Sequence, residues 1–179
     1  MPARRLPLFL LLGLAAAPLT AAAAPPALDP FLARLDGSWD LVGRLGGKPV
    51  HYHGVGRRVL HEGWLRLDLA DVARPPTYEA SVYLGYDAKA GDYVAHWLDR
   101  FGGGGARVVA TGRRDGRRLV LLFPYAEGAF RDTLVLADDG NSGTLLIEAQ
   151  ARDGGWSEFA SYTLARRPAP ARAARRPAQ

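Results

Sequence analysis

The sequence predicts an all-β fold, a closed antiparallel up-and-down β-barrel of about ten strands with a short N-terminal helix. Apolar and polar residues alternate with period two in successive segments, as expected for strands with one buried face. Turn residues separate these segments, and no further segment has the length of an ordinary helix. We favour a barrel over an open sandwich because closure leaves no exposed strand edge.

A short helix is expected at residues 28–35, with Asp29 as its N-cap and Pro30 at the first helical position, where the missing N–H is harmless. Such a helix could brace one end of the barrel. The expected strands then follow in order at about residues 41–45, 49–60, 64–72, 77–86, 93–101, 107–113, 118–125, 130–136, 144–151 and 156–164. The dipeptide Asp115-Gly116 is the strongest short-range hairpin signal among the turns.

The hairpin of residues 77–101 has the plainest pattern. A turn at residues 87–92 pairs Tyr86 with Tyr93. The same register places Tyr83 opposite His96, a pairing that cross-strand chemistry favours. A slip by one residue would turn the apolar face toward the polar side, so the pattern predicts this register.

The ends of the chain differ in composition from the expected barrel domain, residues 25–165. Residues 1–24 have Arg4 and Arg5, then an apolar run, then alanines, which is the order of a secretory signal peptide. The apolar run is about a dozen residues, short of the roughly 20 that span a bilayer; a retained membrane anchor is the alternative. We expect a periplasmic or secreted protein without a transmembrane segment after processing. The Pro/Ala/Arg tail, residues 166–179, is expected to be disordered.

Composition excludes several classes of protein. The chain has no cysteine, which excludes disulfides, a thiolate nucleophile and lipid attachment at an N-terminal cysteine. Two of the 23 basic residues lie in the signal peptide and five in the tail, leaving 16 against 18 acidic residues. A nucleic-acid-binding domain would carry clustered basic residues on its folded surface, so we expect no nucleic-acid partner.

The Gly37-Ser38-Trp39 sequence at the start of the first strand resembles the opening of lipocalins and related calycin barrels, where the tryptophan closes one end. A longer set of segments is similar to an uncharacterised bacterial lipocalin-like family and covers nearly the whole mature domain: Tyr78-Glu79-Ala80, Leu84-Gly85-Tyr86-Asp87, His96-Trp97-Leu98-Asp99, Phe130-Arg131-Asp132 and Trp156, Phe159, Tyr162 and Arg166. This resemblance implies the barrel fold and no particular activity.

A more distant resemblance is to nitrobindin-like barrels, which bind haem. Those barrels use a histidine near the end of the chain as the iron ligand. The last histidine in this sequence is His96, so the expected ligand is absent. We therefore expect no haem and no other cofactor.

An aromatic wall is the main candidate for a ligand site. The residues predicted to line the interior are Tyr78, Val82, Tyr86, Tyr93, Trp97, Asp99, Phe101, Phe123 and Tyr125. Barrels of this size commonly enclose one small ligand, and we predict a hydrophobic or amphipathic one. A solid aromatic core is the alternative. If the inner and outer faces are exchanged, the polar residues Glu79, Tyr83, His96 and Arg100 line the interior instead.

Asp99, Asp132 and His96 are candidates for acid–base catalysis, the basis of an alternative reading as a barrel enzyme. Asp99 shares a strand face with Trp97, and Asp132 with Phe130. Two carboxyl groups in an apolar cavity would have separated pKa values. The plainer expectation is that each pairs with an arginine. A structural envelope protein without a ligand is a third reading.

Two clusters of other residues suggest further contacts. His51 and His53 lie two apart, hence on one strand face, as in a metal chelate. The only other histidine within reach along the chain is His61, so histidines without a metal are favoured.

The arginines that flank Asp115-Gly116 could contact an anionic membrane surface, assisted by the basic tail, although a solvated hairpin tip is the default. These are Arg113, Arg114, Arg117 and Arg118.

Overall fold

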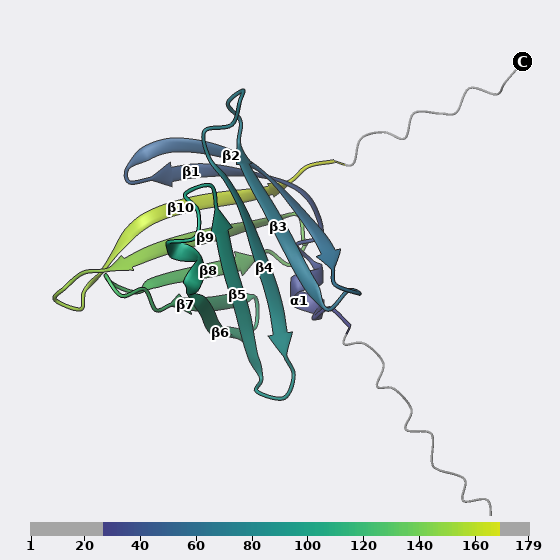
Figure 1. Cartoon of the computed structure of the whole chain (residues 1–179). Helices are drawn as coiled ribbons and strands as arrows, with labels where there is room; N and C mark the ends of the chain where they lie inside the picture. The colour runs from purple at the N-terminus through teal and green to yellow at the C-terminus, as the bar shows by residue number, and fades with distance from the viewer. Residues whose placement is uncertain (1–26, 169–179) are drawn as a thin grey trace, which may run out of the picture.

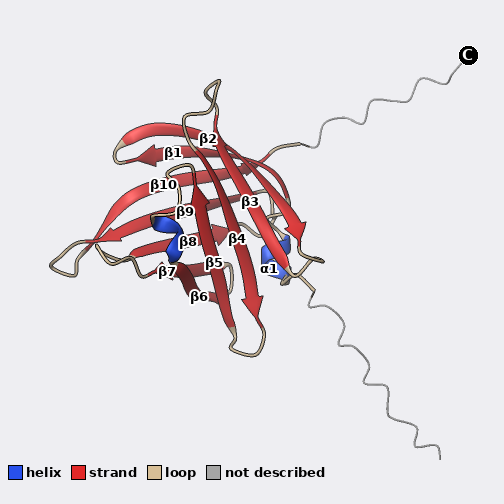
Figure 2. Ribbon diagram, viewed as in Figure 1, coloured by secondary structure: helices blue, strands red, loops and turns tan. Residues whose placement is uncertain are grey.

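The computed structural model describes residues 27–168, which form one closed barrel of ten antiparallel strands (Figures 1 and 2). Each strand pairs with its neighbours in chain order, and β1 also pairs with β10, so the predicted fold class is confirmed. The predicted signal peptide and residues 169–179 of the predicted tail lie outside the described residues. Within residues 27–168, none of the helices has the length and apolar character needed to cross a membrane.

The strands match the predicted segments closely. Their bounds are β1 Gly37–Leu45, β2 Lys48–Val59, β3 Trp64–Asp71, β4 Glu79–Asp87, β5 Asp92–Asp99, β6 Val109–Asp115, β7 Arg118–Phe123, β8 Phe130–Leu136, β9 Ser142–Gln150 and β10 Trp156–Arg166. A single 3₁₀ turn, η1 (Gly105–Arg107), precedes β6. The predicted hairpin register between β4 and β5 is confirmed, because Tyr86 pairs with Tyr93 and Tyr83 with His96.

The N-terminal helix α1 (Pro30–Ala33) is shorter than the predicted residues 28–35. Its capping is as predicted, since the Asp29 carboxylate accepts hydrogen bonds from the backbone N–H groups of Phe31 and Leu32 at 3.0 and 3.2 Å. Phe31 and Leu32 are buried. The helix therefore covers one end of the barrel, where its apolar side chains complete the core (Figure 1).

Trp39 and Arg166 tie α1 to this end of the barrel. The buried indole of Trp39 donates to the carbonyl of Leu35 at 3.0 Å, and the Arg166 guanidinium lies 4.3 Å from the ring. Arg166 also donates to the carbonyls of Arg34 and Asp36 at 2.5 and 2.6 Å. Arg166 is the last residue of β10, so the folded part of the chain extends past the boundary predicted at residue 165.

Gly56 allows the turn that follows α1 to approach the barrel closely. A Cβ atom at this position would lie 2.0 Å from the carbonyl oxygen of Leu35, which is backbone and cannot move aside like a side chain. Gly54, two residues earlier on the same strand face, would place its Cβ 2.9 Å from a side-chain carbon of Leu41. The closed end of the barrel thus requires a residue without a side chain at position 56.

Candidate ligand-binding cavity

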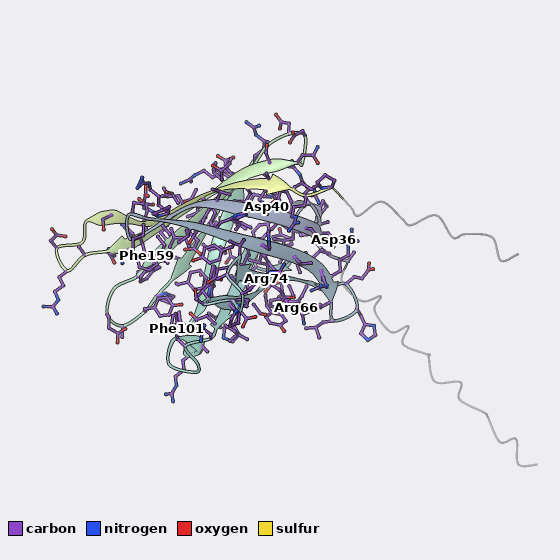
Figure 3. The ribbon with its side chains drawn as sticks, turned by 90° about the horizontal axis from the view of Figure 1, so that it is seen from above. Asp36, Asp40, Arg66, Arg74, Phe101 and Phe159 are labelled. Atoms are coloured by element: carbon purple, nitrogen blue, oxygen red, sulfur yellow. The ribbon has the colours of Figure 1, made fainter. Side chains whose placement is uncertain are left out.

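The half of the barrel away from α1 contains a cavity of about 1060 Å³. Its lining reaches the loops that join β3 to β4, β5 to β6 and β7 to β8. Phe101 is 80% exposed and Phe159 is 42% exposed, and both contribute to the lining. Figure 3 shows these two residues on the side of the barrel away from Asp36, which follows α1. The cavity is therefore open at one end and closed by the helix at the other.

The helix α1 fills one half of the barrel, and the cavity lies in the other half. At the closed end, Leu65, Leu119 and Leu136 are fully buried and belong to the same core cluster as Phe31 and Leu32 of α1. In the other half, the 3₁₀ turn η1 lies at the edge of the cavity, which Gly105 borders. This half of the barrel retains the hollow.

Tyrosine and tryptophan side chains form one wall of the cavity. The ring of Tyr52 packs edge-on against the rings of Tyr78 and Tyr162, with centroids 5.6 and 5.8 Å away. The indole N–H of Trp97 donates to the Tyr78 hydroxyl at 3.1 Å. Burial raises the pKa of Tyr78 to about 12 and also raises that of Tyr162. These hydroxyls therefore stay protonated at neutral pH and offer donors as well as acceptors.

Phenylalanine rings continue the wall on the neighbouring strands. Phe123 lies edge-on to Trp97 and is stacked with Tyr125 at 6.0 Å. Tyr125 packs edge-on against Phe130 at 5.7 Å. Aromatic contacts of this kind hold the rings in fixed orientations. The wall is consequently a preformed apolar surface rather than a set of independent side chains.

Six of the nine predicted lining residues border this cavity: Tyr78, Trp97, Asp99, Phe101, Phe123 and Tyr125. The other three lie elsewhere, which corrects their predicted position. Val82 is buried in the core but does not border the cavity, and Tyr86 is exposed. The hydroxyl of Tyr93 donates to Asp29 at 3.0 Å beneath α1. Tyr86 and Tyr93 share the predicted strand face but lie toward the α1 end, whereas Val82 pairs directly with Trp97.

Asp132 is the buried carboxyl group of the cavity. It is 6% exposed and lies on β8 among the lining residues. No group within residues 27–168 donates a hydrogen bond to it, and the neighbouring Arg131 pairs with Glu148 at 2.8 Å instead. The expected arginine partner is therefore absent. Burial raises the pKa of Asp132 from 3.8 to about 7, because the charged form loses its water without gaining a partner.

Asp99 and His96 complete the set of acid–base candidates. Asp99 borders the cavity and accepts a hydrogen bond from the Phe101 N–H at 3.0 Å. Burial raises the pKa of Tyr125, and the charges of Asp132 and Asp99 raise it further, so both carboxyl groups lie near this hydroxyl. His96 does not border the cavity, and its Nε2 donates to the carbonyl of Ala106 at 2.6 Å. The three candidates do not converge on one site.

The structure adds Asp40 to the predicted pair of histidines. His51 Nε2 and His53 Nδ1 lie 3.2 and 2.8 Å from Asp40 Oδ1, and one ligand atom from each residue lies within 4.8 Å of the others. Sequence inspection missed Asp40 because it lies on β1, opposite His53 in a register that depends on the turn between β1 and β2. Three such ligands could hold a divalent cation.

Arg167 competes with a cation at this cluster. Its guanidinium lies 2.9 Å from His53 Nδ1 and 3.7 Å from Asp40 Oδ2. His53 Nδ1 can either donate to Asp40 or accept from Arg167, but not both at once. Burial acts to raise the pKa of Asp40, but the hydrogen bonds of His51 and His53 and the charge of Arg167 outweigh it and lower that pKa. The cluster is thus already neutralised by groups of the protein.

The arginines at the β6–β7 turn are largely engaged by the protein. Arg113 pairs with Asp92 at 3.1 Å, and Arg117 pairs with Asp138 at 2.8 Å. Arg114 donates to the Tyr93 hydroxyl at 2.8 Å. This turn lies at the α1 end of the barrel, so a membrane that contacted it would face away from the mouth of the cavity.

Comparison with known proteins supports the fold. No protein-family model matches the chain, and no curated protein matches its sequence. Among solved structures, the chain is similar to the crystal structure of Rv2717c from M. tuberculosis, with 17% sequence identity and a TM-score of 0.53. The similarity covers 79% of this chain and 99% of the other. The class defined by this fold and cavity is a ten-stranded antiparallel barrel with an interior open at one end.

Proposed function

We propose that the protein is an exported, lipocalin-like barrel that binds a small hydrophobic or amphipathic ligand in its interior. The observation that carries this proposal is the cavity of about 1060 Å³ with its aromatic wall. Ligand pockets generally enclose about 300–1,000 Å³ and are lined mainly by apolar and aromatic side chains. The predicted signal peptide supports a periplasmic or secreted location.

Exposed apolar side chains around the mouth support entry of such a ligand. Phe101, Phe159 and Val72 all border the cavity and present large apolar surfaces to solvent. Clustered apolar exposure of this kind is typical of binding sites rather than of an ordinary surface. An amphipathic molecule could leave a membrane or carrier at this rim and pass into the cavity without full exposure to water.

Intrinsic tryptophan fluorescence tests the proposal. Trp97 borders the cavity, whereas Trp156 stacks under Arg131 and does not border it. Titration with long-chain alcohols, amines, fatty acids and an apolar dye should change the emission of the wild-type protein and of Trp156→Phe. The change should be largely lost in Trp97→Phe. A flat titration across the whole panel would contradict the proposal and favour a structural protein without a ligand.

Catalysis by Asp132 is a second candidate, favoured by its pKa of about 7, which suits a general acid or base at neutral pH. The test begins with native mass spectrometry of protein purified from its own envelope fraction, which would identify a co-purified ligand. That ligand is then incubated with the wild-type protein and with Asp132→Asn. A change in ligand mass that requires Asp132 would establish turnover. Binding without any such change would leave the protein a carrier.

A further inference from the structure

The charged side chains that border the cavity are all of one sign. Asp71, Asp99, Glu127 and Asp132 contribute carboxyl groups, and no lysine or arginine within residues 27–168 borders it. A ligand with a carboxylate or phosphate would bring a second negative charge beside these groups without a counter-charge. Like charges in a desolvated site repel strongly, so the lining disfavours fatty acids.

Two of these carboxyl groups already have partners in the fold. Asp71 accepts hydrogen bonds from the backbone N–H groups of Ala73, Thr77 and Tyr78, at 2.8 to 3.0 Å, and so organises the loop between β3 and β4. Asp99 accepts from Phe101. Asp132 is different, because it is 6% exposed and no described group donates to it. A buried carboxyl group without a donor is costly, and a ligand that supplied one would remove that cost.

The aromatic wall favours a cation at the same place. Tyr125 and Tyr162 are close enough to Asp132 for its charge to raise the pKa of both hydroxyls, after the larger effect of burial. The faces of aromatic rings attract cations, and phenol oxygens accept hydrogen bonds from ammonium groups. An ammonium ion beside Asp132 would therefore meet a carboxylate, hydroxyl acceptors and aromatic rings.

We propose that the ligand is an amphipathic amine, an organic cation whose ammonium group pairs with Asp132 and whose apolar body lies along the aromatic wall. This inference rests on the proposed function, since it names the ligand class for the same cavity. The roomy cavity accommodates a long-chain or polycyclic body. Binding involves no covalent step: the ammonium N–H groups donate to the Asp132 carboxylate, which loses its proton to solvent if it is protonated beforehand.

The test compares three ligands with the same chain: dodecylamine, dodecanol and dodecanoate, each below its micellar concentration, by Trp97 fluorescence and calorimetry at pH 7.5. We expect the amine to bind roughly tenfold or more tightly than the alcohol, because close pairs of opposite charge at protein interfaces contribute at least that much affinity. The acid should bind most weakly. In Asp132→Asn the amine should lose this advantage, while the affinity for dodecanol stays within about twofold. Glu127→Gln, another lining carboxyl group at the mouth, is the matched control and should keep most of the advantage.

Proton release provides a second readout. Because the pKa of Asp132 is about 7, binding of the amine at pH 7 should release about half a proton per site, whereas dodecanol should release none. Calorimetry in buffers of different ionisation enthalpy measures this number. In Asp132→Asn, any proton release that remains comes from the other titratable groups that border the cavity. These are Asp71, Asp99, Glu127, His51, Tyr52, Tyr78, Tyr125 and Tyr162.

The outcomes separate the two proposals. Equal affinity for the amine and the alcohol, or an amine preference that survives in Asp132→Asn, would overturn the amine inference while leaving a ligand-binding cavity. Tightest binding of dodecanoate would do the same. Failure of all three ligands to change the fluorescence or to produce heat would overturn both.

Discussion

Asp132 makes the stability of the folded chain depend on pH in a direction opposite to that of most acidic residues. Its pKa is about 7 in the folded state against an ordinary value of 3.8. Well below pH 3.8 the group is neutral in both states and costs nothing. As the pH rises toward 7, the unfolded chain ionises first, so stability falls, and above pH 7 the loss is constant. A difference of about three pKa units corresponds to about 4 kcal/mol.

Replacing Asp132 with Asn removes the ionisation and should remove this pH-dependent loss. We expect the difference in free energy of unfolding between Asp132→Asn and wild type to grow in favour of the variant by up to about 4 kcal/mol from pH 4 to pH 8. At pH 8 this corresponds to a rise in melting temperature on the order of 10 °C. Urea unfolding at several pH values measures it, with the exposed Asp115→Asn as control. A difference that does not change with pH would refute the reasoning.

Three further substitutions test the closed end and the histidine cluster. Arg166→Ala should lower the free energy of unfolding in urea by about 2–4 kcal/mol, because its carbonyl hydrogen bonds and ring stacking are lost, and a loss below about 1 kcal/mol would contradict that role. Gly56→Ala should cost about 1–3 kcal/mol more than Gly54→Ala, because only the former meets backbone; equal costs would argue against the close approach of α1. Zinc should leave the wild-type melting temperature unchanged but raise that of Arg167→Ala, in which the competing guanidinium is gone. A zinc-dependent rise in the wild-type protein would contradict this competition, and no rise in the variant would show that the cluster is not a metal site.

The strand pattern could be predicted from the sequence because alternation and turn residues are local signals. The register between β4 and β5 followed from a single hairpin turn. Depth along the barrel axis has no such local signal. Tyr93 and Trp97 share one strand face, yet Tyr93 bonds to Asp29 under the helix while Trp97 borders the cavity. Which aromatic residues face a hollow depends on where α1 docks, and this is set by contacts distant in sequence.

The roles of Arg166 at the closed end and of Asp40 in the histidine cluster were not predicted, for a related reason. Arg166 begins a Pro/Ala/Arg stretch whose average composition indicates disorder, but its own guanidinium reaches the carbonyls next to α1 and the ring of Trp39. Asp40 joins the histidines only through the register of β1 on β2. Both depend on pairings between segments, which composition and alternation do not encode.

Asp132 differs from the partnered polar groups next to α1, and this difference supports a ligand in the open half. At the closed end the Tyr93 hydroxyl donates to Asp29 and accepts from Arg114, and the Trp39 indole donates to Leu35. At the open end Asp132 has no donor within the described chain, although burial penalises its charge. A fold that needed Asp132 only for stability would be better served by an apolar side chain of similar size. The cost of burying Asp132 falls where a guest molecule could offset it, which is the arrangement expected of a binding site rather than of a core.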